Sequence, residues 1–422
     1  MGFSANWRRR RGLTVTAGAT LAAVAATALA GGVIATAGAS AATAEGNAAT
    51  AGSRSFGAEA GSVTATAAES LSMLPAGRVG ARAAIPWRLV GPGWALAEFT
   101  TGSAKAAGPV WLFLVDPAGG RYRVYRWAAT GQPWQLVDWS GDKARALFEN
   151  QGGSRPALHQ LVLASGKVST FRLPSATDFM LGYTRPSGTN ILVSGHGIAR
   201  YNLAGVPQAQ LISGSGYNAA LSSADGTTEV VNGSTGVELV SNTGGVIRRL
   251  HVPGATAKLG GCTPVRWWNS STALVSCVAS TAIYSPRIWL VPVSGSAPLA
   301  LTAVRNGRDG DYGDTDAWRF GKTVYVQALG ACGVRYIGRQ RSNGSVAPVN
   351  VPGSAGNNAV VATAGHRMLV QEFSECTPSS SVVWFSPATG ATQDVLMAPE
   401  SEDGVVSVVA YNRDGEQPSV LP

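Results

Sequence analysis

A turn that ends in glycine recurs seven times along the chain and limits the possible folds more than any other feature. Each copy is an apolar stretch, a tight turn and a second short stretch, as in VWLFLVDPAGG and RIWLVPVSGS. Tight hairpin turns need positive φ, which glycine reaches without a Cβ clash. The turn glycines, 39 to 51 residues apart, are Gly119, Gly166, Gly205, Gly244, Gly295, Gly344 and Gly390.

A second hairpin turn precedes each of these glycines, so each unit of the repeat holds four strands. The second turns lie at residues 91–93, 139–143, 185–190, 223–227, 268–272, 320–323 and 364–367. Four-stranded units at this period are the signature of a β-propeller. We therefore predict an all-β propeller domain over residues 85–422, with seven four-stranded blades and with six or eight blades as the alternatives.

Two of the strand-and-turn units carry a resemblance to a known family. WLVPVSGS at residues 289–296 and VWFSPATG at residues 383–390 resemble the repeat of the TolB-like and WD40-like β-propellers of secreted bacterial proteins. The resemblance extends over residues 85–412. It implies a propeller fold in an exported protein, and it implies no particular ligand. The first hairpin turns mostly lack the SPDG signature of TolB-like repeats.

The N-terminal region has the composition of an export signal followed by a linker. A run of arginines, Arg8–Arg11, precedes a weakly apolar stretch and then small residues up to Ala44, which is the order found in secretory signal peptides. We predict a signal peptide at residues 1–44 for Sec or Tat export, cleaved after Ala44 or alternatively after Ala41. A retained membrane anchor is the competing interpretation, although the stretch is Ala, Thr and Gly and not Leu and Ile. Residues 45–84 are predicted to be a flexible Ala/Gly/Ser/Thr-rich spacer.

The charge balance excludes some classes of partner. The chain has 33 basic and 24 acidic residues, and four of the basic ones fall in the predicted signal peptide. No run of Lys and Arg follows that segment. The sequence therefore predicts no nucleic-acid partner and no stable membrane insertion after signal cleavage, and we expect a monomer.

Four cysteines are placed where two disulfides can form. Cys262 and Cys277 flank one hairpin symmetrically, so they lie opposite each other on paired strands. Cys332 and Cys376 end equivalent strands of adjacent units. Because an exported chain favours disulfides, we predict the pairs Cys262–Cys277 and Cys332–Cys376. A metal site is disfavoured, since no CxxC and no nearby His are present.

A Gly-rich loop at residues 305–318 gathers four carboxylates, Asp309, Asp311, Asp314 and Asp316. Such a cluster can bind Ca²⁺, which prefers several oxygen ligands, although the spacing does not match an EF-hand. A general acid/base carboxylate and a solvated loop are the other interpretations. The same loop face is predicted to carry six further acidic residues, and an acidic face favours a cationic ligand or a basic partner. These residues are Asp178, Glu372, Glu375, Glu400, Glu402 and Asp403.

No motif of a known catalytic type accompanies the four His residues, so no catalytic residue is predicted. We expect a secreted, non-catalytic propeller that acts as a ligand- or protein-binding scaffold in the cell envelope or outside the cell. Its protein or glycan partner would bind at the loop face, with no cofactor apart from the candidate calcium. The alternative is a secreted carbohydrate-active hydrolase or lyase that uses carboxylates on the acidic loop face.

The end of the repeat predicts how the ring closes. Residues 404–412, GVVSVVAYN, are apolar and β-branched and should form a buried strand beside the first unit, near Trp87–Phe99. PWRLV at residues 86–90 matches PWQLV at residues 133–137, so it reads as the first strand of blade one. In that case the C-terminal strand would begin a partial eighth unit.

Overall fold

The chain folds into a series of small antiparallel sheets, because its apolar residues alternate at the period of a strand. The fold is taken from a computed structural model. It describes residues 72–100, 108–127, 134–150, 155–280, 284–307, 310–373, 380–397, 404–411 and 420–421. The chain divides into two units, residues 1–70 and 71–422, and all described residues belong to the second. The predicted signal peptide therefore lies outside the described residues.

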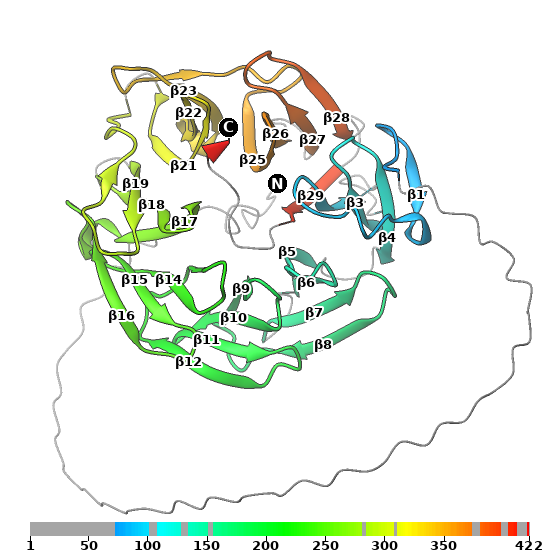
Figure 1. The fold of residues 1–422 in the computed structure, drawn as a ribbon, viewed down its shortest axis with the longest axis horizontal. Coiled ribbons are helices and arrows are strands. Elements are labelled where there is room, and N and C mark those ends of the chain that lie inside the picture. Colours follow the sequence, from blue (N-terminus) through cyan, green and yellow to red (C-terminus); the bar gives the residue numbers. More distant parts are fainter. Residues whose placement is uncertain are drawn as a thin grey trace, which may run out of the picture. The chain divides into compact units, whose positions relative to one another are not determined.

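Blades two to seven each use four consecutive strands, and the seven blades surround a common centre (Figure 1). Blades two and three are β5 (Gln135–Trp139), β6 (Arg145–Asn150), β7 (Ala157–Val162), β8 (Val168–Arg172), β9 (Phe179–Tyr183), β10 (Asn190–Gly195), β11 (Gly197–Asn202) and β12 (Pro207–Ser213). Blades four and five are β13 (Ala220–Ser222), β14 (Thr228–Asn232), β15 (Gly236–Ser241), β16 (Val246–His251), β17 (Cys262–Asn269), β18 (Thr272–Val278), β19 (Pro286–Pro292) and β20 (Leu299–Ala300). Blades six and seven are β21 (Gly313–Phe320), β22 (Thr323–Leu329), β23 (Arg335–Gln340), β24 (Val346–Pro348), β25 (Asn357–Ala364), β26 (Arg367–Phe373), β27 (Ser380–Phe385) and β28 (Thr392–Leu396).

Blade one is completed by the end of the chain. It contains β29 (Gly404–Ala410), β2 (Ala95–Thr100), β3 (Val110–Val115), β4 (Arg121–Trp127) and an added outer strand, β1 (Val79–Ala81). Strand β29 pairs antiparallel with β2, from Ala95 opposite Ala410 to Thr100 opposite Gly404. Strand β29 is therefore the innermost strand of blade one, and the predicted closure and the predicted count of seven blades are both confirmed. A short strand β30 (Val420–Leu421) pairs in parallel with β21.

The prediction that PWRLV forms the first strand of blade one is wrong. Residues 86–90 form turns, whereas the matching segment after Pro133 does form β5. The physical reason is that β29 already occupies the inner edge of β2, so no edge is left for residues 86–90 to pair with.

The packed domain also begins earlier than the predicted boundary at Ile85. Strand β1 pairs in parallel with β4, with Val79 opposite Arg121, and Leu74 packs against the apolar core of blades one and two. The predicted spacer, residues 45–84, therefore overlaps a segment that belongs to blade one. Residues 45–71 lie outside the described residues.

The recurring glycines have the backbone conformation that the sequence predicts. All seven have positive φ, between 74° and 103°. At Gly205 a second constraint applies, because a Cβ there would lie 2.4 Å from the ring of Phe171 in the preceding blade. Neighbouring blades thus approach one another closely at this turn.

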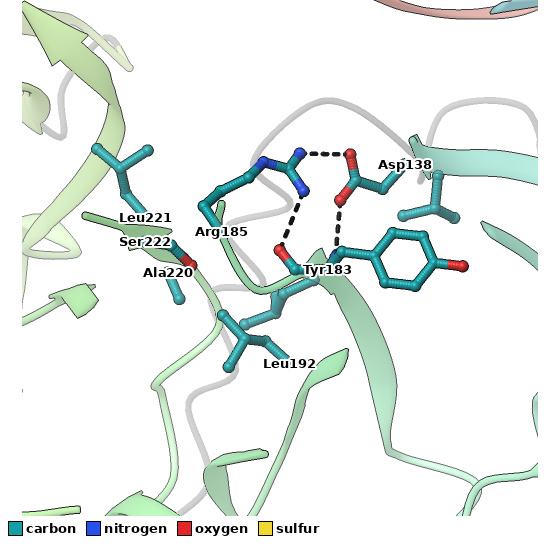
Figure 2. Close-up of a pocket in the computed structure, with 10 residues that line it drawn as sticks. Asp138, Tyr183, Arg185, Leu192, Ala220, Leu221 and Ser222 are labelled. Carbon is teal, nitrogen blue, oxygen red and sulfur yellow. Dashed lines mark hydrogen bonds and ion pairs between the residues drawn. The ribbon is translucent and has the colours of Figure 1, made fainter. Parts of the chain in front are cut away.

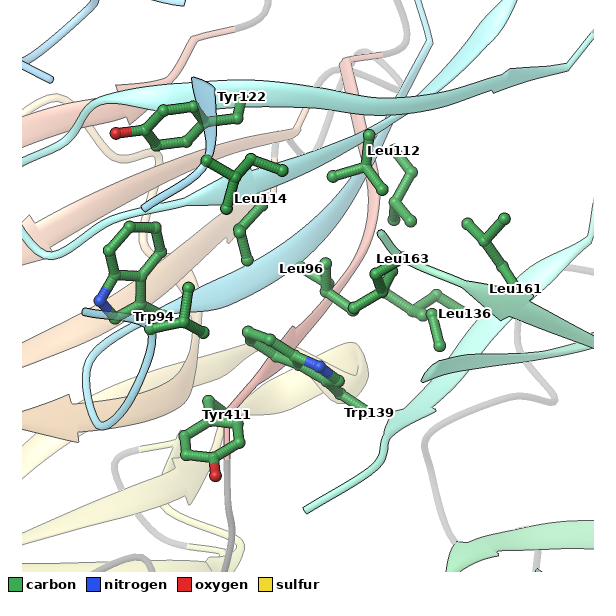
Figure 3. Packing of buried hydrophobic residues seen from close by; sticks show 14 of the residues in the cluster. Trp94, Leu96, Leu112, Leu114, Tyr122, Leu136, Trp139, Leu161, Leu163 and Tyr411 are labelled. Carbon is green, nitrogen blue, oxygen red and sulfur yellow. The ribbon is translucent and has the colours of Figure 1, made fainter. Parts of the chain in front are cut away.

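Neighbouring blades are held together by apolar seams with buried polar contacts. Between blades one and two, Trp94, Leu96 and Trp139 are buried together with Tyr411, which follows β29 (Figure 3). The Tyr411 ring lies 5.1 Å from Trp139, and its hydroxyl donates a hydrogen bond of 2.8 Å to the carbonyl of Gly141. In the same seam, Glu98 Oε2 accepts a 2.7 Å hydrogen bond from the Leu136 amide of the next blade.

The described helices are single 3-10 turns: η2 (Arg82–Ala84), η3 (Ala257–Leu259) and η5 (Ala331–Gly333). Within the described ranges, no helix has the length and apolar character needed to cross a bilayer.

The structure contains the predicted Cys262–Cys277 disulfide, between directly paired positions of β17 and β18. Cys376 and the side chain of Cys332 lie outside the described residues, so the second bridge stays a prediction. Peptide mapping without reduction should recover both pairs, and a Cys262→Ser/Cys277→Ser variant should lose about 3 kcal/mol of unfolding free energy. Free thiols at all four positions, or a Cys262–Cys376 peptide, would contradict this pairing.

Candidate functional site

The acidic loop at residues 305–316 is organised around an arginine. Arg305 forms ion pairs of 3.2 Å with both Asp311 and Asp314, and the Asp314 side chain is fully buried. Burial raises the pKa of Asp314 to about 6, and the charge of Arg305 acts in the opposite direction. Asp309 lies outside the described residues. The two described aspartates therefore neutralise a buried guanidinium.

Asp316 is directed to a different arginine. Arg266, on the inner strand β17 of blade five, forms a 2.9 Å ion pair with Asp316 and donates a hydrogen bond to the Ala317 carbonyl. Its guanidinium lies 4.4 Å from the centre of the Trp318 ring. The loop's described carboxylates are thus divided between two arginines. Among the described residues, no three His, Cys, Asp or Glu side chains gather in a group that could hold a metal ion.

Calcium binding in this loop would require Arg305 to release Asp311 or Asp314, which would cost a buried guanidinium one of its two ion pairs. We therefore expect the melting temperature to be the same in calcium chloride and in EDTA, as measured by differential scanning calorimetry. A calcium-dependent rise that disappears in Asp311→Asn would show that the loop does bind the ion.

The remaining acidic residues of the predicted loop face are described only in part. Burial raises the pKa of Glu372 to about 7, and the neighbouring Asp394 adds to this. Asp178 accepts a 2.9 Å hydrogen bond from the Ser175 amide in its own loop. Glu375, Glu400, Glu402 and Asp403 lie outside the described residues. The described carboxylates of this face thus include a buried one and one that caps a loop.

A small cavity lies where blades two, three and four meet, near the ends of their inner strands β5, β9 and β13 (Figure 2). Its volume is about 130 Å³. Its wall combines apolar side chains with an ion pair and a hydroxyl. The main lining residues are Val137, Leu181, Leu192, Leu221, Asp138, Arg185 and Ser222.

The charged groups of this cavity are engaged with each other. Arg185 forms a 2.8 Å ion pair with Asp138 and donates a hydrogen bond of 3.3 Å to the Tyr183 carbonyl. The other carboxylate oxygen of Asp138 accepts a 2.7 Å hydrogen bond from the Tyr183 amide. Pockets for drug-sized ligands have volumes of roughly 300–1,000 Å³. This cavity is therefore a polar crevice that ties blade two to blade three and is too small for a sugar chain or a peptide.

A buried carboxylic acid lies directly behind the crevice. Ser222 donates a 3.0 Å hydrogen bond to Glu229, a side chain only 1% exposed. Burial raises the pKa of Glu229 to about 7, although Arg185 and Arg200 favour the charged form. An acid with this pKa can serve in proton transfer, but Glu229 is closed off from solvent.

Glu229 should make the protein less stable as the pH rises. Its pKa rises from 4.5 to about 7 on folding, so the folded state binds the proton more tightly. The contribution of this proton to the unfolding free energy is therefore fully present below pH 4.5, falls between pH 4.5 and 7 and is lost above. We expect Glu229→Gln to be more stable than the wild type at pH 8, by up to about 3 kcal/mol, measured by urea unfolding.

The control for this prediction is Asp225→Asn in the adjacent turn, an exposed carboxylate whose pKa is lowered by a hydrogen bond from Ser223. The unfolding free energy of Asp225→Asn should fall between pH 4.5 and 7 by as much as that of the wild type. Equal pH profiles for the wild type and Glu229→Gln would mean that Glu229 is ionised in the folded protein at neutral pH.

The most buried histidine, His159, has a structural role. His159 stacks on Trp134 with a ring separation of 3.8 Å, and its Nδ1 lies 2.8 Å from the Thr170 hydroxyl. Burial, followed by the charge of Arg172, lowers the pKa of His159. The ring is thus neutral and packed near neutral pH.

Positive charge is concentrated on blade one, where the sequence predicted no site. The described part of residues 72–127 has six arginines but only two acidic residues, Glu98 and Asp116, both fully buried. None of the six forms an ion pair with another described residue. They are Arg78, Arg82, Arg88, Arg121, Arg123 and Arg126. No run of basic residues marks them in the sequence, and the only signal is the alternation in RYRVYRW at residues 121–127.

These observations define the class of the protein as a seven-bladed β-propeller closed by its C-terminal strand. No protein-family model matches the chain, and no curated protein sequence matches it. Solved structures similar to it include TolB from Acinetobacter baumannii, as the sequence resemblance predicts. This match has 14% identity and a TM-score of 0.37 and covers 75% of this chain and 66% of that one.

Two other similar structures come from peptidases. A prolyl endopeptidase matches with 12% identity and a TM-score of 0.47, over 71% of this chain and 49% of that one. The β-propeller domain of the Trilobed protease from Pyrococcus furiosus, described as having an open velcro topology, matches with 8% identity and a TM-score of 0.47, over 75% and 96%. The chain thus spans less than two thirds of the first two structures. At such identities the likeness concerns the fold alone, and the propeller assignment rests on the seven blades themselves.

Proposed function

We propose that the chain is an exported, non-catalytic β-propeller that binds a protein or glycan partner in the cell envelope or outside the cell. The observation that carries the proposal is the distribution of its charges. Arg185, which follows β9, and Arg266, on β17, form ion pairs with Asp138 and Asp316, whereas the six described arginines of blade one form no ion pair with a described residue. Charges that are already satisfied hold blades together, and unpaired exposed charges can meet a partner.

Export is supported by the signal-like composition of residues 1–44 and by the Cys262–Cys277 disulfide, since disulfides persist in oxidising compartments. Expression of the full chain in a bacterium should yield a protein whose N-terminus starts near Glu45 in the envelope or medium. Recovery of the uncut chain in the cytoplasm would contradict export.

The test of a binding function measures affinity and turnover on the same samples. Mature protein would be titrated by biolayer interferometry against alginate, dextran and the surface proteins of the expressing cells, and each polysaccharide would then be assayed for new reducing ends and for unsaturated uronate. Binding without turnover is expected. Turnover of a polysaccharide would support the alternative, a carbohydrate-active hydrolase or lyase, and would overturn the proposal.

A further inference from the structure

Three of the unpaired arginines lie on the same face of one strand. In blade one, β4 pairs with β3 so that Arg126 is opposite Trp111, Arg123 is opposite Phe113 and Arg121 is opposite Val115. Residues 111, 113 and 115 alternate and share a face of the sheet, so their three partners share it too. A β-bulge after Arg123 brings Arg126 onto this face. We call the three arginines, with Trp111 and Phe113, the arginine strip.

The side chains of the strip are ordered by aromatic rings. Arg123 and Arg126 lie 5.3 Å and 5.4 Å from the centre of the Trp111 ring, and Arg121 lies 5.9 Å from that of Phe113. A guanidinium stacked on a ring loses little further freedom when it binds a ligand. The strip is therefore a set of partly immobilised cations.

The strip has excess positive charge that nothing in the described residues balances. Arg123 and Arg126 are exposed, and none of the three forms an ion pair within the described ranges. Burial, followed by the charge of Arg123, lowers the pKa of Arg121. Like charges side by side repel each other, so bound carboxylates would relieve this repulsion as well as form ion pairs.

The spacing of the arginines indicates the shape of the partner. The three arginines lie opposite residues 111, 113 and 115, and residues two apart on a strand are about 6.6 Å apart and face the same side. An extended peptide with acidic residues at alternate positions has the same spacing, so successive carboxylates can meet successive arginines. The strip also faces the seam with blade seven, since Trp111 and Phe113 pack in the cluster that contains Trp384, and Gln393 of β28 donates a hydrogen bond to the Ala118 carbonyl in the turn before β4. A thin, extended chain fits this position better than a flat bilayer does.

We infer that the arginine strip of blade one binds an extended acidic segment of a partner protein, with carboxylates at alternate positions. This inference rests on the proposed binding function and names its surface and its partner class. The strip was not part of the predicted acidic face, so the inference adds a basic binding surface to the acidic one that the sequence predicts.

The test uses mature protein and two fluorescent peptides of equal composition and charge, one with alternating Glu and Ser and one with four Glu followed by four Ser. Fluorescence anisotropy at low salt should show tighter binding of the alternating peptide, with an affinity that falls as salt rises. Arg123→Gln/Arg126→Gln should weaken it about tenfold. The matched control, Arg248→Gln/Arg249→Gln, removes the same charge from the exposed outer strand of blade four and should change affinity less than about twofold.

Three results would overturn the inference: equal affinity for the two peptides, equal loss in the two double variants, or tighter binding of alginate or phosphatidylglycerol vesicles than of the alternating peptide. The last result would assign the strip to a glycan or a membrane. If the protein still binds its partner after Arg123→Gln/Arg126→Gln, the strip is not the binding surface, and the proposed binding function still stands. Polysaccharide turnover would reject the proposed non-catalytic function, whereas the peptide assay tests peptide binding by the strip separately.

Discussion

Deletion of residues 404–422 should lower the melting temperature by more than about 10 °C, because it removes the inner strand of blade one. The deletion strips β29 from the edge of β2 and exposes the seams that Val408 and Tyr411 fill, side chains 1% and 7% exposed. Burial of one such side chain is worth about 1.5–3 kcal/mol. The total stability of a domain is only about 5–15 kcal/mol. Scanning calorimetry of the two chains measures the difference.

The matched control is deletion of residues 412–422, which keeps β29 and Tyr411 and should melt close to the wild type. A finer comparison is Tyr411→Phe, which keeps the packing on Trp139 but loses the hydrogen bond to Gly141, at a cost of about 1 kcal/mol. If the longer deletion melts like the shorter one, β29 does not close the ring.

The blade count could be predicted because it depends on local backbone geometry. A turn that needs positive φ selects glycine wherever it occurs, so the period of the blades is visible in the sequence. The closure could be predicted for a similar reason, since an apolar β-branched stretch after the last unit needs an edge to pair with. The identity of the inner strand of blade one could not be predicted, because PWRLV and PWQLV have the same local preference for a β-strand. Only the competition with β29 for the edge of β2 separates them.

The candidate site could not be predicted because two β-bulges change which residues share a face. In blade six, Asp314 is opposite Ala328 and Asp316 is opposite Gln327, so a bulge between them sends the two carboxylates to opposite faces of β21. The acidic cluster of the sequence is therefore divided in space. In blade one a bulge has the reverse effect and brings Arg126 beside Arg123. Neither bulge has a local signal in the sequence.

The division of the acidic cluster has a large energetic consequence at Arg266. Its side chain is only 8% exposed, and it neutralises Asp316 while donating to the Ala317 carbonyl across the seam between blades five and six. Loss of one member of a buried ion pair costs about 3–5 kcal/mol, because the other charge is left without compensation. We therefore expect Arg266→Met to lose about that much unfolding free energy, measured by urea denaturation.

The control for Arg266→Met is the same substitution at Arg249, whose 3.6 Å ion pair with Glu238 involves an arginine side chain that is 79% exposed. An exposed pair contributes about 0–1 kcal/mol, so Arg249→Met should be nearly silent. The double variant Arg266→Met/Asp316→Asn should regain part of the loss, because it removes the uncompensated carboxylate as well. A double variant no more stable than Arg266→Met would mean that the cost comes from the lost stacking on Trp318 and the lost bond to Ala317. Equal values for Arg266→Met and Arg249→Met would mean that Asp316 and Arg266 are solvated, and that this inner-strand pair does not hold blades five and six together.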